Sequence, residues 1–182
     1  MAQREKPMQL DDEAQLVGRA RGGEIGALDA LMNAHRDRIL NLAWQILRDH
    51  EAAEDAAQEA FVRAFSGLNS FRGASSFGTW MYRVALNVCL EKRRALKPES
   101  EPENEESAAP SSDHDLKMTL DWVLDQLPEP LRLSLILREW HGLSYEEMAV
   151  VCTVPLGTVR SRLHEARARF REIWLELERE TS

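Results

Sequence analysis

The amino-acid sequence predicts an all-α fold with two small helical domains joined by a flexible acidic linker. Apolar residues recur at intervals of three and four along both halves of the chain, which is the pattern of amphipathic helices. The alternation of apolar and polar residues that marks a half-buried strand is not evident. Residues 97–115 separate the halves, contain no aromatic residue and are rich in Pro, Glu and Ser. Such a segment buries too little apolar surface to offset its ordering entropy, so we expect a linker.

The linker also explains the acidic balance of the chain. Seven acidic residues and one lysine between residues 97 and 115 account for −6 of the net charge of −8. The rest of the chain is nearly neutral and contains basic stripes, so the net charge does not exclude a nucleic-acid partner. We expect a solvated, self-repelling spacer. A second interpretation is an acidic mimic of DNA that covers a basic groove until a partner displaces it. The expected boundaries are 10–96 for the first domain, 97–116 for the linker and 117–178 for the second domain.

The first half of the chain contains three expected helices. One has its apolar face within residues 28–47. A second follows Asp49, an expected N-cap, and has an alanine-rich face within residues 53–68. Small alanine side chains let these two helices pack closely together. The third begins near Ser75 or Ser76, after a short loop with a central glycine.

A helix-turn-helix pattern occupies residues 142–171 of the second half. Ser144 and Glu147 form a capping box in front of a short helix. Residues 154–157 supply a turn, and a longer helix begins around Thr158. This order of cap, short helix, turn and long helix is typical of DNA-binding proteins.

The long helix carries a basic outer face. Its expected inward stripe includes Val159, Leu163 and Ala166, which places several arginines on another side. Such a row suits a major groove, where Arg pairs bidentately with guanine and neighbouring side chains reach phosphates. The alternative is a solvated amphipathic helix. The candidate DNA-binding residues are Thr158, Arg160, Ser161, Arg162, His164, Arg167 and Arg171.

A second candidate surface is the loop at residues 69–75 with the helix that follows it. Aromatic residues interleaved with bases can stack on unpaired nucleotides while cations hold the backbone. By spacing alone, Phe77, Trp80 and Val84 favour the core, whereas Arg72, Tyr82 and Arg83 are the better candidates for exposure. The full candidate set is Asn69, Ser70, Phe71, Arg72, Gly73, Trp80, Tyr82, Arg83 and Asn87.

The second helix leaves a polar face opposite its alanines. This face contains Glu54, Asp55, Gln58, Glu59 and Arg63. On the residues alone, a solvated surface is the favoured interpretation.

Other classes of function have no support in the sequence. Five scattered histidines show no spacing typical of a metal site, and two cysteines form neither a disulfide framework nor a four-ligand zinc site. No nucleophile triad, phosphate-binding glycine loop or nucleotide fingerprint is legible, so we expect neither an enzyme nor a cofactor. No stretch is apolar enough to cross a membrane, and we expect a protein of the reducing cytoplasm.

Four segments, in this order and spacing, closely resemble the extracytoplasmic-function (ECF) sigma factors of bacterial RNA polymerase. They are EDAAQEAFVRAF (54–65), LNSFRGASSFGTWMYRVALN (68–87), LPEPLRLSLILREWHGLSYEEMA (127–149) and VPLGTVRSRLHEARARFR (154–171). The resemblance covers about residues 10–178. Two features depart from the family pattern. Cys152-Thr153 stands where members often have a Leu-Gly-like approach to the turn, and the linker is more acidic than most.

The resemblance implies a role for each surface. The polar face from Glu54 to Arg63 would dock on the clamp helices of the polymerase β′ subunit. The loop and third helix would recognise and melt the minus-10 region, and the helix-turn-helix domain would read the minus-35 element. Core RNA polymerase, including its β subunit, promoter DNA and an anti-sigma factor are the implied partners.

Two other classes of protein remain as alternatives. A stand-alone helix-turn-helix regulator would bind an operator as a dimer, but it leaves the N-terminal half unexplained. A protein-interaction adaptor would use the acidic linker and helical faces without DNA, and the arginine row argues against it. Transcription reconstituted with purified core polymerase separates all three.

Overall fold

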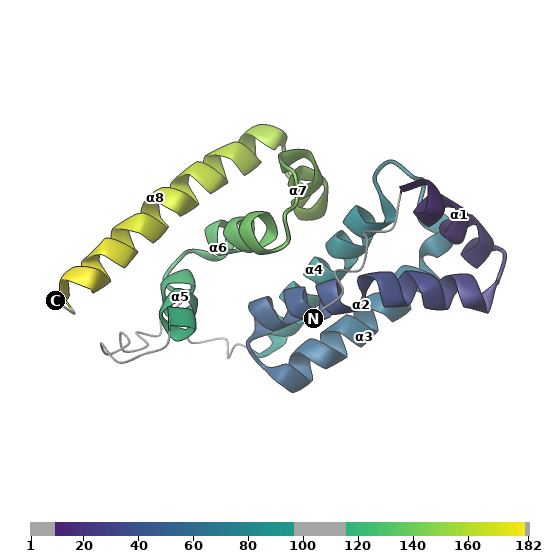
Figure 1. Cartoon of the computed structure of the whole chain (residues 1–182), viewed down its shortest axis with the longest axis horizontal. Helices are drawn as coiled ribbons and strands as arrows, with labels where there is room; N and C mark the ends of the chain where they lie inside the picture. Colours follow the sequence, from purple (N-terminus) through teal and green to yellow (C-terminus); the bar gives the residue numbers. More distant parts are fainter. Residues whose placement is uncertain (1–9, 97–115, 181–182) are drawn as a thin grey trace, which may run out of the picture. The chain divides into compact units, whose positions relative to one another are not determined.

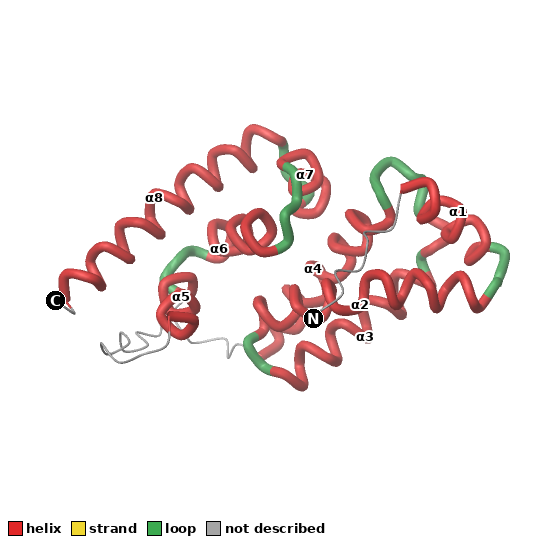
Figure 2. The backbone as a smooth tube through the Cα atoms, viewed as in Figure 1, coloured by secondary structure: helices red, strands yellow, loops and turns green. Residues whose placement is uncertain are grey.

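The computed structural model describes residues 10–96 and 116–180, and every regular element in this part of the chain is a helix (Figures 1 and 2). The chain divides into two compact units. The N-terminal unit contains α1 (Leu10–Arg21), α2 (Ile25–Leu47), α3 (His50–Ser66), the 3-10 turn η1 (Leu68–Ser70) and α4 (Phe77–Leu96). The C-terminal unit contains α5 (Leu116–Asp125), α6 (Glu129–Leu135), the π-helical turn η2 (Ile136–Trp140), most of α7 (Tyr145–Cys152) and α8 (Leu156–Glu180). The predicted all-α fold is confirmed.

The N-terminal unit is built around the pair α2 and α3, which lie close together over much of their length. The face of α2 expected to be apolar is buried at Leu31, Ile39 and Leu42, and buried alanines line the facing side of α3. Asp49 caps α3 as expected, because its carboxylate accepts a hydrogen bond from the backbone amide of Ala52 at 2.7 Å. In this pair of helices, the apolar faces and the N-cap predicted from the sequence are therefore the ones that the fold uses.

Helix α4 is enclosed on more than one side. Trp80 and Tyr82 are only 8% and 2% exposed. Residues two positions apart in a helix point to nearly opposite sides, about 200° apart around the axis, so α4 is covered on both sides. The helix begins after Ser76, whose hydroxyl accepts a hydrogen bond from the Thr79 amide at 3.0 Å, as the expected start near Ser75 or Ser76 requires. The burial of Tyr82 depends on Arg38 of α2, a contact that the spacing of residues within α4 does not report.

The C-terminal unit contains the predicted helix-turn-helix. The Ser144 amide donates to the Glu147 carboxylate at 2.8 Å, and the Glu147 amide donates to the Ser144 hydroxyl at 3.1 Å, which forms the expected capping box. Helix α7 ends in a turn where Thr153 has a positive φ of 55° and the Val154 amide donates to the Ala149 carbonyl. This pairing is the Schellman motif, in which glycine usually occupies the left-handed position.

Helix α8 begins at Leu156, two residues before the expected start. Val159, Leu163 and Ala166 are buried as predicted, which confirms how the helix is rotated. The expected acidic linker, residues 97–116, lies almost entirely outside the described residues, since α5 begins at Leu116. No described helix is long and apolar enough to span a membrane.

Candidate functional site

The outer face of α3 presents a contiguous polar surface. Glu54, Asp55 and Gln58 are exposed, because the buried alanines hold the opposite side of the helix against the core. One turn further on, Val62 is 59% exposed and lies on the same face as Asp55 and Gln58. The sequence reasoning missed Val62, although a single apolar residue at this spacing on a polar face was visible in the sequence. The α3 surface, defined as Glu54, Asp55, Gln58 and Val62, therefore combines acids with one apolar contact.

Glu59 and Arg63, the other two candidates on α3, are already engaged within the protein. Arg63 forms ion pairs with Glu59 at 2.6 Å and with Glu91 of α4 at 2.7 Å, and Lys92 lies 3.4 Å from Glu59. The hydrogen bond from Arg63 lowers the pKa of the Glu59 carboxyl, and the bonds to Glu91 and Glu59 raise the pKa of Arg63. These four side chains tie α3 to α4, so Glu59 and Arg63 brace the surface as well as bordering it.

The loop before α4 is anchored at Phe71 and exposed at its tip. The ring of Phe71 packs against Phe77 and Trp80, with ring centroids 5.9 and 5.3 Å apart. Arg21 of α1 lies over the same ring at 5.8 Å and donates to the Leu68 carbonyl at 3.2 Å. The half-buried Phe71 thus fixes the start of the loop to the aromatic side chains of α4.

Other candidate residues of this loop face outward. Asn69, Ser70, Arg72 and Gly73 are all exposed. Gly73 has a φ of 71°, a left-handed conformation that residues with a side chain adopt at a cost. The loop therefore offers a cationic tip whose base is held by aromatic packing.

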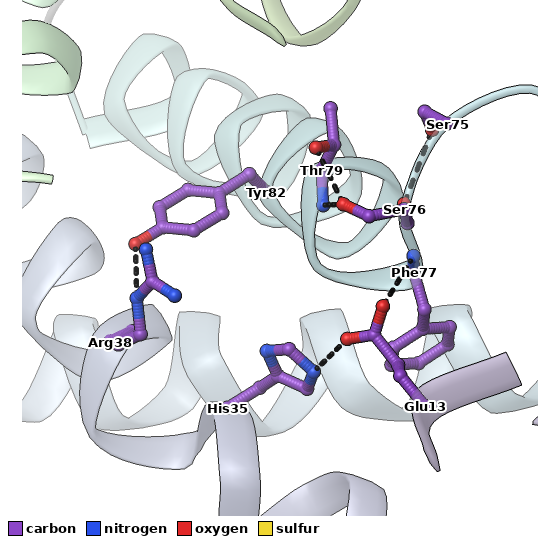
Figure 3. A network of polar contacts seen from close by, with 8 residues as sticks. All are labelled: Glu13, His35, Arg38, Ser75, Ser76, Phe77, Thr79 and Tyr82. Carbon is purple, nitrogen blue, oxygen red and sulfur yellow. Dashed lines mark hydrogen bonds and ion pairs between the residues drawn. The ribbon is translucent and has the colours of Figure 1, made fainter. Parts of the chain in front are cut away.

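Two aromatic candidates for base stacking, Trp80 and Tyr82, are buried. Trp80 packs between Phe71 and Phe77 and belongs to the support of the loop, as its spacing alone had favoured. Tyr82 was expected to be exposed, but it is 2% exposed. Its hydroxyl accepts a hydrogen bond from Arg38 of α2 at 3.2 Å, and the guanidinium lies 5.3 Å from the ring centroid (Figure 3). Neither ring is available for stacking on a nucleotide in this conformation, because α4 is enclosed on both sides.

The remaining candidates on α4 form a row. Arg83 is half-buried and Asn87 is exposed, and they lie one helical turn apart on the same side. With the loop tip, this row makes the available polar surface of the predicted minus-10 site.

The N-terminal half of α8 is the exposed part of the helix-turn-helix. Arg160, Ser161 and His164 are exposed, and Thr158 and Arg162 are half-buried. The Ser161 hydroxyl donates to the Thr158 carbonyl at 3.0 Å, so it is partly engaged within the helix. Within residues 10–96 and 116–180, Arg160 has no ion-pair partner. This arginine is therefore available to a ligand.

Arg167, further along α8, is held by another helix. Its guanidinium forms an ion pair with Glu139 of η2 at 2.7 Å, and this hydrogen bond raises the pKa of Arg167. The sequence pattern placed Arg167 in one outward row with Arg160 and Arg171, and all three are exposed to solvent. Arg167 differs from Arg160 and Arg171 in this respect, because its charge is already partly balanced by Glu139.

An apolar groove of about 670 Å³ lies beside this ion pair in the C-terminal unit. Its walls come from α5, α6, η2 and α8, and its exposed apolar residues include Leu116, Trp140 and Leu175, which are 68%, 42% and 43% exposed. Phe170 and Trp174 stack against each other on the α8 side. Large exposed apolar residues gathered in one hollow are typical of a protein-binding surface. The sequence reasoning missed this groove because its walls come from segments far apart in the chain.

Comparison with known families matches residues 31–98 to sigma-70 region 2 and residues 118–170 to sigma-70 region 4. The RNA polymerase sigma-H factor of Pseudomonas aeruginosa is 39% identical over 175 residues, which cover 86% of this chain and 91% of that protein. The ECF RNA polymerase sigma-E factor of Escherichia coli is 34% identical over 182 residues, with 87% and 92% covered.

Solved structures show the same fold. CnrH, solved with the cytosolic domain of CnrY, matches with a TM-score of 0.72 and 21% identity over 89% of this chain and 96% of that one. The sigma factor RpoE of Bartonella quintana, solved with the anti-sigma factor NepR, matches with a TM-score of 0.64 and 23% identity over 80% and 95%. The resemblance carried by the four sequence segments is confirmed, and the chain belongs to the extracytoplasmic-function (ECF) family of RNA polymerase sigma factors.

Proposed function

We propose that this chain binds core RNA polymerase and directs it to promoters through four separate surfaces. Sigma factors are transcription initiation factors, and family membership sets this class of function. The observation that carries the assignment to particular residues is the exposed start of α8, where Arg160 lies on the outer face of a capped helix-turn-helix. The four targets are the β′ clamp helices, the minus-10 strand, the minus-35 duplex and the β subunit.

The α3 surface is the proposed contact with the β′ clamp helices. Its acids are exposed and its reverse side is committed to the core, so a partner can bind it without disturbing the fold. Val62 adds the apolar contact that protein interfaces usually place among polar residues. Glu59 and Arg63 contribute by holding the surface in place through Glu91 and Lys92.

The loop tip and the α4 row are the proposed contact with the minus-10 strand. Arg72 supplies a cation at the tip, and Arg83 and Asn87 extend the polar surface along α4. Phe71 and Trp80 act as support, because their rings pack inside the protein. Bases of a melted strand would enter beside Arg72, where the loop leaves space around Gly73, whose Cβ position lies in open space.

The minus-35 duplex is the proposed target of the first half of α8. Residues near the N-terminus of a recognition helix normally reach base edges, whereas later residues reach phosphates. Arg160 and Ser161 lie in this first half, with Arg162 and His164 beside them. Arg171, exposed on the later part of the helix, is proposed to contact phosphate.

The apolar groove is the proposed contact with the β subunit of core polymerase. The first half of α8 is proposed to contact bases, whereas its later half, including Arg171, lines this groove, so binding there would hold the reading helix on the enzyme. We also propose control by an anti-sigma factor, a partner that the Bartonella quintana neighbour has in its solved complex. Such a regulator would act by covering the surfaces that core polymerase needs.

Reconstituted transcription with purified core polymerase tests the assignment. The wild-type chain should support initiation from a promoter selected from a randomised library, and core enzyme alone should not. Asp55→Arg should weaken competition with a labelled wild-type chain for core enzyme, because it reverses the charge at the centre of the α3 surface. Asp37→Arg is the matched control, since it reverses the charge of another exposed acid, on α2.

Three outcomes would contradict parts of the proposal. Absence of promoter-specific initiation would refute the function as a whole. Normal competition by Asp55→Arg would show that another surface binds the clamp helices. An Arg72→Ala holoenzyme with unchanged permanganate reactivity of the minus-10 strand would remove the loop tip from that site.

A further inference from the structure

A buried carboxylate joins three helices beneath the proposed minus-10 surface. Glu13 of α1 is 8% exposed and His35 of α2 is 6% exposed. One carboxylate oxygen of Glu13 lies 3.0 Å from Nε2 of His35, and the other accepts the backbone N–H of Phe77 at 3.0 Å (Figure 3). Phe77 is the first residue of α4, so the carboxylate meets the positive end of that helix.

Local capping does not explain this contact. Ser76 already caps α4 through the Thr79 amide, and the N–H of a first helical residue is usually left to water. The acceptor for Phe77 comes instead from a residue 64 positions earlier. Burying a carboxylate is costly unless hydrogen bonds satisfy it, and the two bonds of Glu13 do so. The specific effect of this arrangement is to fix α1 and α2 against the start of α4.

Helix α1 holds both ends of the loop. Arg21 donates to the Leu68 carbonyl and lies over the Phe71 ring at the start of the loop. Glu13, about 12 Å away along the same helix, holds the N-terminus of α4 at the end of the loop. The loop tip at Arg72 and Gly73 lies between these two anchors in the chain and is exposed.

The absence of a side chain at Gly78 makes room for this contact. A Cβ atom placed there would lie 3.1 Å from Cε1 of His35 and 3.7 Å from the Glu13 carboxylate. Gly78 therefore allows the His35 ring to approach the first turn of α4.

We propose that Glu13 and His35 are positioning residues for minus-10 recognition, which hold the loop in the geometry that selects a base. This inference rests on the proposed role of the loop. Neither side chain would touch DNA, because both are buried. They act through the start of α4 and, together with Arg21, through both anchors of the loop.

The test compares base discrimination with stability in the full-length protein. Holoenzymes carrying Glu13→Ala, Glu13→Gln, Gly78→Ala or Asp49→Ala would be measured on single-stranded minus-10 oligonucleotides that match or differ at one base. Asp49→Ala is the stability control, because it removes the N-cap of α3 in the same unit and leaves the Glu13 contacts intact. The melting temperature of each chain would be recorded alongside.

Glu13→Ala should reduce the discrimination ratio about tenfold, the scale that one well-placed base contact supplies. Glu13→Gln keeps an oxygen that can accept the Phe77 N–H and should restore part of the ratio. Gly78→Ala should reduce the ratio, since its Cβ would lie 3.1 Å from Cε1 of His35 and would displace the ring. Asp49→Ala should lower the melting temperature and leave the ratio within about twofold, because distant sites act independently.

An unchanged ratio in both Glu13→Ala and Gly78→Ala would overturn the inference. If Glu13→Ala fails to fold, Gly78→Ala and Arg21→Ala decide, since Arg21 is the other anchor. Arg72→Ala serves as the reference for the proposed function. If it lowers the ratio while the Glu13 and Gly78 variants do not, the loop binds DNA and the positioning role is wrong. If Arg72→Ala has no effect either, the proposed function of the loop itself fails.

Discussion

Arginines at two positions on α8 should behave differently, although the sequence places them in the same row. Arg160 is exposed near the start of the helix, whereas Arg167 lies about 10 Å further along and forms an ion pair with Glu139 at 2.7 Å. Arg160→Ala should lose roughly 1–3 kcal/mol of discrimination at one minus-35 position, which corresponds to a bidentate contact with guanine. Arg167→Ala should change the sequence preference little, because its guanidinium is already engaged.

The ion pair between Arg167 and Glu139 determines how much Glu139→Gln should change stability and DNA binding. Its two side chains are 45% and 47% exposed, so solvent screens the pair and its contribution to stability should be below about 1 kcal/mol. Glu139→Gln weakens the pair and releases the arginine toward DNA. We expect this variant to bind all sequences more tightly and to steepen the dependence of log K on log salt by about 0.9, the effect of one added phosphate contact.

Titration of each holoenzyme against a library of minus-35 variants at several salt concentrations measures both quantities. Glu165→Gln is the matched control, because it releases Arg169 from a pair within the same helix at 2.8 Å. Unchanged preference in Arg160→Ala, or altered preference in Arg167→Ala alone, would refute the proposed orientation of α8. An unchanged salt slope in Glu139→Gln would show that Arg167 cannot reach the phosphates.

Three further predictions concern stability and reactivity. Thr153→Gly should raise the free energy of unfolding of the C-terminal unit by about 1 kcal/mol in denaturant titration, because the φ of 55° at Thr153 is strained for a residue with a side chain. A less stable variant would contradict this strain. Ser144→Ala should lower it by about 1 kcal/mol through loss of the capping box, with no change expected if the cap is dispensable. Burial raises the pKa of the Cys89 thiol to about 12. In a Cys152→Ser variant, where Cys89 is the remaining cysteine, alkylation at pH 8 should therefore require unfolding. Rapid labelling of the folded protein would contradict the burial of Cys89.

The sequence alone determined what depends on neighbouring residues. The caps at Asp49 and Ser144, the buried stripe of α8 and the buried alanine face of α3 all follow from residues within a turn or two of each other. Periodicity reports these features because helical geometry brings positions three and four apart onto one side. The family could also be recognised from the sequence, since its four characteristic segments lie in order along the chain.

Tertiary structure alone decided which charged and aromatic side chains remain available. Tyr82 is enclosed by Arg38, which lies 44 residues earlier, and Arg167 is paired with Glu139, which lies 28 residues earlier. Glu13 reaches the start of α4 across 64 residues. A helical period predicts which side of a helix faces the core, but it carries no information about which distant residue lies opposite. Those partners are set by how the helices pack, and packing depends on the whole set of side chains between them.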